Sequence, residues 1–459
     1  MRLPSLLASL ALTSFLTACV ATPPAEVSKG FIDGRTTDQG LAVMQAFVPA
    51  QPIGVTRGNA EMAADFLDLE FRMESGRALP VLTRFDGPIT IGLRGDVPPV
   101  ATSELQRVLG RMRNEAGLDV SMASAGTQPS ITIEFMPKST LRRAVPSAAC
   151  FVVPNVGSFG EYMKARGTAA TDWGRITHRK QATIFVPSDT SPQEVRDCLH
   201  EELAQAMGPL NDLFRLPDSV FNDDNFHAVL TGFDMLMLRV HYAPELRSGM
   251  NEAEVAARLP AILARLNPAG QGRGTGPKAM TPRSWISTVE ATFAGRSGAR
   301  LSMADRLIGI ARAQGWNDGR LAFSYFARAR AKTGSDTSGA IADYNEAARI
   351  WRNTPGAAIH VAHVDMQLSA FALSSGQFDE VIRMTDRAVP VARTHQNASL
   401  LSSLLAMRAE ALEATGRDAE ARSARLDSLG WARYAFGSDT QVRARMGDIA
   451  SLAARGRRG

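Results

Sequence analysis

The apolar residues of this chain recur with two different periods, and each period predicts one kind of element. Short apolar runs with alternating polar residues predict β-strands over residues 88–93, 130–135 and 182–187. Between the first two strands, apolar residues at helical spacing predict a helix over residues 103–114, with Leu105, Val108, Leu109 and Met112 on one face. The order strand, helix, strand predicts an α+β domain.

A further helix follows the third strand, and the sequence indicates both of its ends. Ser191 is a typical N-cap residue, Pro192 suits the first helical position, and Glu194 completes a capping box. Gly208 followed by Pro209 predicts the end of the helix. One stripe of apolar residues at helical spacing predicts its buried face: Val195, Leu199, Leu203 and Ala206.

The second half of the chain has the pattern of a helical domain. Glycine and proline concentrate in residues 266–300 and predict a linker between an α+β domain at 80–265 and a helical domain at 301–459. In the helical domain a pattern of small and aromatic residues repeats at roughly forty residues. Gly376, Phe378, Val381 and Ala388 are echoed by Gly416, Asp418, Ala421 and Ser428, and an earlier copy contains Ala340, Tyr344 and Ala347. The pattern resembles degenerate tetratricopeptide repeats, which stack helix pairs into a concave partner-binding surface. A plain helical bundle is the alternative.

The first residues predict where the chain resides. Residues 1–18 contain a basic residue and a short apolar run, and they end in the lipobox Leu-Thr-Ala before Cys19. Such a box is cleaved before its cysteine, which is then acylated, so residues 19–79 read as a lipid-anchored tether and N-terminal segment. Val20 is not the aspartate associated with inner-membrane retention, which favours the outer membrane, facing the periplasm. The alternative is an ordinary signal peptide or a short membrane anchor, although the apolar run is far below the ~20 residues that span a bilayer.

Composition excludes some classes of function. The 459 residues are about three times the usual ~150 residues of a domain, and 45% of them are hydrophobic. The formal charge of +5 is modestly basic, and no Lys/Arg cluster is interleaved with aromatic residues as nucleic-acid binding requires. The sequence therefore predicts a globular envelope protein with a membrane anchor, a peptide or protein partner, and no nucleic-acid partner.

The cysteines agree with an oxidising compartment. Apart from Cys19, the chain contains only Cys150 and Cys198. An even pair in such a compartment predicts a disulfide that clamps the helix containing Cys198 to a neighbouring strand or loop. Two buried free thiols are the alternative.

The helix and the turns after it resemble a zinc-protease scaffold. Metzincins carry H-E-x-x-H-x-x-G-x-x-H, and the same spacing here contains Glu201, Glu202, Gln205, Gly208 and Asn211. A register that starts at His200 fails, because it places Ala204 at the second ligand position and Met207 at the glycine. Downstream, Ser219, Val220 and Phe221 resemble the methionine-containing turn of metzincins with Phe221 in place of methionine, and residues 230–242 resemble the closing helix. The earlier strand, helix, strand order resembles the upper half of metzincins, which implies a mixed sheet backed by helices.

A closer resemblance is to a family of proteobacterial lipoproteins known as domain of unknown function 2927. Its hallmark is a cysteine followed by E-E-x-x-Q, a glycine, N-D and S-[VI]-F. The matching residues are Cys198, Glu201, Glu202, Gln205, Gly208, Asn211, Asp212, Ser219, Val220 and Phe221. The resemblance covers roughly residues 80–265 and implies no function by itself.

The ligand positions do not favour zinc. Catalytic zinc takes three protein ligands and a water, and an amide is a poor zinc ligand. Glu201, Gln205 and Asn211, with the neighbouring Asp212, form a set of oxygen ligands that suits calcium better than zinc. We therefore expect no cofactor, with zinc or calcium as the alternative.

Glu202 is the one candidate catalytic residue, because it occupies the general-base position. The alternative is a buried carboxylate that accepts hydrogen bonds from strand amides or an arginine. The histidines outside the motif have no ligand spacing to one another, so we read them as solvated or core residues: His178, His200, His227 and His241.

Two functions follow from these patterns. The first is a binding or assembly lipoprotein whose metzincin-like domain has lost zinc catalysis and holds a peptide, while the helical repeats recruit a second partner. The alternative is an envelope metallopeptidase with unusual Glu/Gln/Asp ligation and Glu202 as its general base.

Overall fold

A computed structural model describes most of the chain beyond the N-terminal segment. The described residues are 44–48, 54–55, 57–146, 148–274, 276–294 and 297–458. The predicted signal peptide and Cys19 lie outside them. None of the helices in these ranges has the length and apolar character needed to cross a bilayer.

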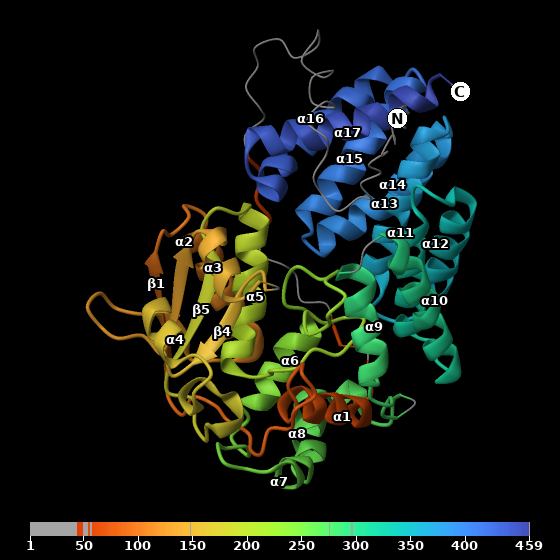
Figure 1. Cartoon of the computed structure of the whole chain (residues 1–459). Helices are drawn as coiled ribbons and strands as arrows, with labels where there is room; N and C mark the ends of the chain where they lie inside the picture. Colours follow the sequence, from red (N-terminus) through yellow and green to blue (C-terminus); the bar gives the residue numbers. More distant parts are fainter. Residues whose placement is uncertain are drawn as a thin grey trace, which may run out of the picture.

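The first domain is built on a five-stranded sheet (Figure 1) with the strand order β2-β1-β3-β5-β4. Its strands are β1 (Ile89–Gly95), β2 (Val120–Met122), β3 (Ile131–Met136), β4 (Phe151–Pro154) and β5 (Ala182–Pro187). All neighbouring strands are parallel except β4, which pairs antiparallel with β5 at one edge. Every residue of β5 is buried, as expected of a strand that is covered on both faces. The predicted strands correspond to β1, β3 and β5, and the predicted mixed sheet is confirmed.

The described part of the first domain also contains eight helices. They are α1 (Asn59–Glu70), α2 (Ala101–Ala116), α3 (Lys138–Ala144), α4 (Phe159–Ala165), α5 (Pro192–Met207), α6 (Gly232–His241), α7 (Glu252–Ala256) and α8 (Leu259–Leu266), with 3-10 turns η1 (Ala169–Thr171), η2 (Trp173–Arg175) and η3 (Pro268–Gly270). Three of these helices were predicted: α2, α5 and α6. Helix α5 begins at the predicted capping box of Ser191 and Glu194 and ends before Gly208. Its predicted apolar stripe is fully buried.

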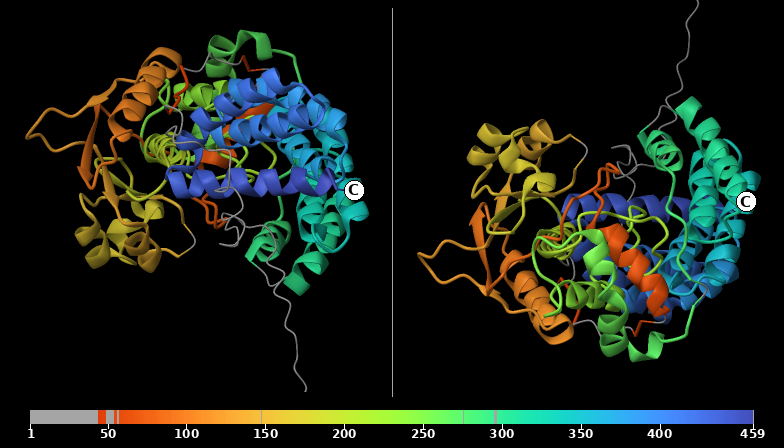
Figure 2. Two further views of the ribbon diagram at one scale, coloured as in Figure 1. Left: turned by 90° about the horizontal axis from the view of Figure 1, so that it is seen from above. Right: turned by 90° about the horizontal axis from the view of Figure 1, so that it is seen from below.

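The rest of the chain is all-helical, as predicted. It contains α9 (Arg283–Ala294), α10 (Ser297–Ala313), α11 (Gly319–Lys332), α12 (Thr337–Arg352), α13 (Ala358–Ser374), α14 (Phe378–Thr394), α15 (Ala398–Ala414), α16 (Asp418–Phe436) and α17 (Asp439–Gly456). Successive helices pack against each other, and α17 packs against α13 and α15 (Figure 2). The turns before α14 and α16 each place a glycine in the left-handed region, Gly376 at φ 72° and Gly416 at φ 76°.

The domain limits differ from the prediction at two places. Residues 283–300, predicted as linker, contain α9 and the start of α10, because Trp285 and Val289 are buried in the helical core. Residues 57–79, predicted as part of the N-terminal segment, contain α1, whose Phe66 is buried in the core of the first domain. Both segments carry apolar residues at helical spacing.

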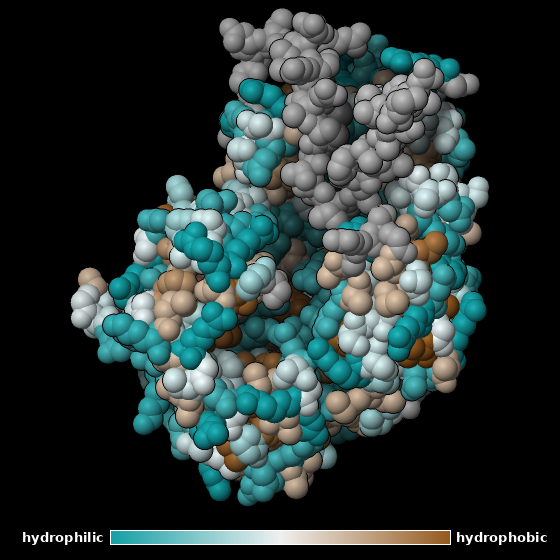
Figure 3. Space-filling model, in the orientation of Figure 1, coloured by the Kyte–Doolittle hydropathy of each residue, from teal (hydrophilic) through white to brown (hydrophobic). Residues whose placement is uncertain are grey.

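The two domains are joined by side chains that cross between their cores. Phe214 and Phe226 belong to the first domain but pack in the core of the helical domain. The Phe214 ring lies 4.9 Å from the Trp285 ring, and the Phe226 ring lies 5.6 Å from that of Trp351. The surface is hollowed where the domains meet (Figure 3). The loop that carries these two rings therefore belongs structurally to both domains.

The predicted disulfide is confirmed. Cys150, next to β4, is bonded to Cys198 of α5, with 6.0 Å between their Cα atoms. The bond closes a loop of 48 residues. Closing a loop of that length stabilises the fold by about 4 kcal/mol through the chain entropy of the unfolded state.

Four of the seven histidines meet at the domain interface. His227 comes from the loop before α6, His360 and His363 from α13, and His395 from the end of α14. The His227 ring centroid lies 5.9 Å from that of His360 and 5.3 Å from that of His395. His360 Nε2 lies 2.8 Å from Asp224 Oδ2.

Burial and mutual repulsion keep most of these imidazoles neutral. Burial, reinforced by His360, lowers the pKa of His227 to about 3. Burial also lowers the pKa of His363 and of His395 to about 3, and the neighbouring histidines add to both shifts. Arg330 is a further positive charge that faces His363.

We predict that this interface is destabilised by acid. The folded pKa of these histidines lies below the ordinary value of 6.5, so the folded state binds fewer protons than the unfolded state. The contribution of these histidines to the free energy of unfolding is fully present above pH 6.5 and is lost as the pH falls toward 3. Urea unfolding at pH 7.5 and pH 5 measures the loss. His227→Gln should reduce the pH slope of the unfolding free energy by up to about 1.4 kcal/mol per pH unit.

The exposed His178 supplies the matched control, because its substitution by glutamine should leave this slope unchanged. An equal slope in the His227→Gln variant and the original chain would contradict the prediction.

Candidate functional site

The C-terminal end of α5 is held by one buried arginine. Arg179 donates to the carbonyl oxygens of Gln205 and Ala206, both at 2.7 Å, and also to that of Gly208. The Tyr242 hydroxyl donates to the Met207 carbonyl at 2.9 Å. These donors satisfy the carbonyl groups that a helix leaves free at its end. A cation at this end also interacts favourably with the helix dipole.

Gly208 lies where two other helices approach the end of α5. A Cβ atom at this position would lie 3.3 Å from Leu238 of α6, 3.6 Å from Glu70 of α1 and 3.6 Å from His241. Glu70 and His241 form a buried pair, with 2.9 Å between Oε1 and Nδ1. The predicted helix stop is therefore also the point where α1, α5 and α6 meet.

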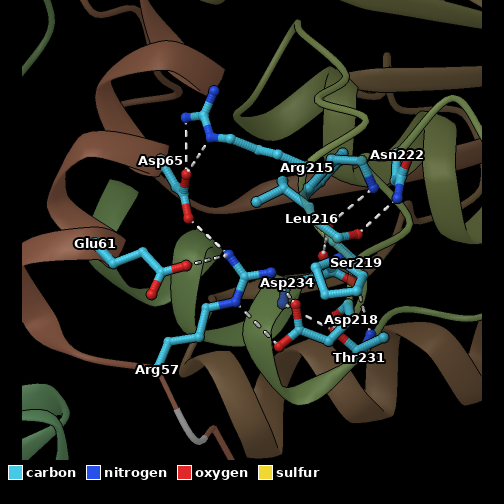
Figure 4. A network of polar contacts seen from close by, with 12 residues as sticks. Arg57, Glu61, Asp65, Arg215, Leu216, Asp218, Ser219, Asn222, Thr231 and Asp234 are labelled. Carbon is cyan, nitrogen blue, oxygen red and sulfur yellow. Dashed lines mark hydrogen bonds and ion pairs between the residues drawn. The ribbon is translucent and has the colours of Figure 1, made fainter. Parts of the chain in front are cut away.

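The predicted turn at residues 219–221 is organised by Asp234 (Figure 4). Its carboxylate accepts from the Ser219 hydroxyl, from the Val220 amide at 3.1 Å and from the Thr231 amide at 2.7 Å. Burial raises the pKa of Asp234 to about 6, although these hydrogen bonds oppose the shift. Phe221 is fully buried in the core. Asp234 also caps α6, so the turn and that helix form one unit.

Two buried arginines tie this loop to α1 (Figure 4). Arg57 donates to Asp65 at 2.7 Å and pairs with Asp218 through two of its nitrogens. Arg215 donates to Asp65 at 2.8 Å and to Asp68 at 2.6 Å. Sequence reasoning missed this network, since its members lie about 150 residues apart along the chain.

The candidate metal and catalytic positions lie in a cluster of carboxyl groups. Glu201 and Glu202 of α5 and Asp212 after it are joined by Glu74 and Asp223, which come from exposed loops. Burial raises the pKa of Glu74, and the neighbouring Asp212 side chain opposes this shift. Sequence reasoning missed Glu74 and Asp223, because neither lies in a motif.

Burial and like charge raise the pKa values of the whole cluster. Burial raises the pKa of Glu201 to about 8 and that of Asp223 to about 7, with Glu74 adding repulsion in both cases. Burial also raises the pKa values of Glu202 and Asp212 well above the usual range. These two side chains are 5% and 8% exposed, and Glu202 Oε2 and Asp212 Oδ1 have no hydrogen-bond partner among the described residues. Burial and the neighbouring carboxyl groups thus favour the protonated form of Glu202, and its buried Oε2 has no hydrogen-bond partner among the described residues.

The donor set does not fit zinc. Gln205 is a buried neutral amide, and the Asn211 amide nitrogen donates to the Asp68 carbonyl at 2.8 Å. Gln205 and Asn211 thus occupy the two motif positions at which a zinc site would need imidazole ligands. Within the described ranges, no group of three or more His, Cys, Asp or Glu side chains is arranged to hold a metal ion.

The histidines outside the motif are distributed over the structure. His200 Nδ1 accepts from the Leu230 amide at 3.2 Å, and burial lowers its pKa well below the ordinary value. His241 belongs to the buried pair with Glu70, and His227 lies at the domain interface. His178 is exposed, with Nε2 4.0 Å from an Asp86 carboxylate oxygen.

A groove of about 570 Å³ lies beside the edge strand β4. We call it the β4 groove; its lining comes from residues 73–77, from β4 and from the segment that includes η1 and η2. The lining residues are Met73, Arg77, Val152, Val153, Pro154, Tyr162, Arg166, Gly167, Thr168, Ala169, Thr171, Asp172, Trp173 and Arg175.

The outer edge of β4 presents free backbone groups to this groove. The Asn155 amide donates to the Gln181 carbonyl at 2.9 Å, which sets the phase of the antiparallel ladder between β4 and β5. Alternation along the ladder then turns the N–H and C=O of Val152 away from β5. Among the described strands, only β5 pairs with β4. Val152 can therefore bond an added strand.

The carboxyl cluster predicts a loss of stability at alkaline pH. The pKa values of these carboxyl groups in the folded state exceed their ordinary values. Their contribution to the free energy of unfolding is therefore fully present below pH 4.5 and is lost as the pH rises toward 8. Glu202→Gln cannot ionise, so its unfolding free energy should fall less between pH 5.5 and pH 8.5, by up to about 1.4 kcal/mol per pH unit. Urea unfolding at the two pH values measures this difference. The control is Asp119→Asn at an exposed site. If Glu202→Gln leaves the pH dependence of the unfolding free energy unchanged, the raised pKa of Glu202 is refuted.

Comparison with known proteins agrees with the resemblance seen in the motif. No curated protein and no solved structure was found to match the chain. Residues 59–261 match the family model described as "Protein of unknown function (DUF2927)". The match begins at the first residue of α1, so it includes the helix that the arginine network ties to the turn, and it supports assigning this part of the chain to that family.

Proposed function

We propose that the chain is an envelope lipoprotein that binds a peptide or protein segment in extended form, without cutting it. The observation that carries this proposal is the free edge of β4, where Val152 presents its N–H and C=O to the β4 groove. Addition of a strand to a free sheet edge is a common mode of peptide recognition, in which backbone hydrogen bonds contribute affinity and neighbouring pockets contribute specificity.

The metzincin-like origin of the first domain belongs to this proposal. It is supported by the motif spacing from Glu201 to Asn211, by the turn at residues 219–221 and by a mixed sheet that precedes α5. In such a scaffold zinc would polarise the scissile carbonyl and activate a water. The donor set described above does not fit zinc, and burial beside like charges disfavours the ionised form of Glu202 that a general base requires.

A metal-dependent peptidase with Glu202 as general base is the second candidate. The observation that favours it is Asp212, a motif residue whose buried Oδ1 has no hydrogen-bond partner among the described residues. A hard cation such as calcium prefers oxygen ligands. Binding of such an ion would ionise these carboxyl groups, so the two candidates predict different behaviour with added metal.

The helical domain and the N-terminus complete the proposal. Successive packed helices from α11 to α16, with left-handed glycines at two recurring turns, support tetratricopeptide-like stacking and a second partner. The lipobox supports acylation at Cys19 and anchoring in the outer membrane, facing the periplasm.

We predict binding without turnover. The whole chain, incubated with a pool of end-capped random heptapeptides, should retain peptides, and mass spectrometry should recover them at their original masses. Glu202→Gln should retain the same peptides, with or without added Zn²⁺ or Ca²⁺. Cleavage by the original chain that disappears in Glu202→Gln would establish the peptidase instead. Retention of no peptide at all would refute the binding function.

We also predict that Cys19→Ser releases the chain from the membrane. Without the thiol, the lipobox cannot be acylated, so the variant should move from the membrane fraction to the soluble fraction of cells that express it. Metabolic labelling with a fatty acid provides the direct measurement. Thr22→Ala, three residues after the lipobox cysteine, is the matched control and should stay labelled. Equal labelling of the Cys19→Ser variant would refute the lipoprotein assignment.

A further inference from the structure

The β4 groove carries an excess of positive charge. Its lining contains three arginines, Arg77, Arg166 and Arg175, and a single acidic residue, Asp172. Arg77 donates to Asp172 at 3.1 Å, and Arg175 Nε lies 3.6 Å from the same carboxylate. Asp172 is therefore shared by Arg77 and Arg175, and the lining of the groove keeps a net positive charge.

Arg166 is the arginine that this pairing leaves out. Its backbone amide donates to the Tyr162 carbonyl at 2.7 Å at the end of α4. Its exposed guanidinium makes no hydrogen bond or ion pair with another described residue. A guanidinium presents its donors in a planar fork that matches the two oxygens of a carboxylate. The Arg166 side chain thus lines the groove, and its guanidinium donors are available to a ligand.

The free strand edge is too short to give affinity alone. Val152 offers one N–H and one C=O, and Pro154 has no N–H to donate. Each net hydrogen bond contributes only about 1 kcal/mol, so side-chain contacts must supply most of the affinity. The groove provides two kinds of contact: apolar surface at Met73 and Trp173, and the Arg166 charge.

We infer that the β4 groove binds an extended peptide segment with an acidic side chain, whose carboxylate pairs with Arg166 while the segment bonds Val152. This inference rests on the proposed binding function and adds the chemistry of the partner. An added strand extends past Val152 in both directions. The carboxylate that pairs with Arg166 is therefore that of a side chain within the segment and not the C-terminal carboxylate of the peptide. Alternate side chains of a strand face opposite ways. A segment that alternates acidic and apolar residues therefore fits the strand period.

The test uses the whole chain and three labelled probes. They are end-capped heptapeptides of alternating valine and glutamate, valine and glutamine, or valine and lysine, each with fluorescein at its N-terminus. Fluorescence anisotropy measures the dissociation constants. The glutamate peptide should bind about two- to fivefold more tightly than the glutamine peptide, since an ion pair at an exposed arginine contributes less than about 1 kcal/mol. The lysine peptide should bind most weakly.

Two variants assign the effect to the groove. Arg166→Gln should abolish the preference for glutamate, whereas Arg142→Gln, at an exposed arginine of α3 outside the groove, should preserve it. Val152→Pro removes the outward N–H but none of the bonds to β5, so it should weaken all three peptides, while Val152→Ala should not.

The outcomes separate this inference from the function on which it rests. Equal binding of all three peptides that is weakened by Val152→Pro would overturn the acidic partner and leave the binding function intact. A preference for glutamate that survives in Arg166→Gln would also overturn the inference. Binding of none of the probes, together with retention of none of the random heptapeptides, would overturn both.

Discussion

The burial of helix α5 on nearly all sides is the constraint on which the rest of the structure depends. Twelve of its sixteen residues are buried, although the sequence supplies only one apolar stripe. The helix packs against the sheet and α2 within its own domain and against α16 of the helical domain. Polar residues on its other faces are therefore enclosed as well, and buried polar groups are costly unless they find partners.

Most of these polar groups do find partners, and the partners come from distant parts of the chain. Arg196 donates to the Gln396 carbonyl at 2.7 Å, and the Gln193 side chain accepts from the Ser399 amide at 2.8 Å. These bonds reach the turn between α14 and α15, so they position the helical domain against the first. Two atoms of α5 stay without a hydrogen-bond partner among the described residues, Arg196 Nη1 and Glu202 Oε2, and at Glu202 burial favours the neutral carboxyl group by raising its pKa.

Features that are local in the sequence were predictable, and those held by distant partners were not. The limits of α5 follow from Ser191 and Gly208, and the disulfide follows from the only two remaining cysteines. By contrast, β2 has three residues and exists through its pairing with β1. The positions of Glu74 and Asp223 beside Glu201 depend on where two loops fold back, which no periodicity encodes. The helix at 283–294 did carry a signal in its buried Trp285, but the glycine-rich stretch before it led to a linker prediction.

Under the metzincin-like origin that we propose, structural contacts at the ligand positions explain how the motif spacing can outlast zinc chemistry. Asn211 now bonds the backbone of α1, and the loop after it is held by Arg215 and Asp234 rather than by an ion. A metal ion holds its ligands in place only when it is bound, whereas these hydrogen bonds and ion pairs form as part of the fold itself. Selection for a stable cleft would therefore preserve the spacing, Gly208 and the turn even without zinc. What such a cleft keeps is a shape with a free strand edge, and that is a property of a binding site as much as of an enzyme.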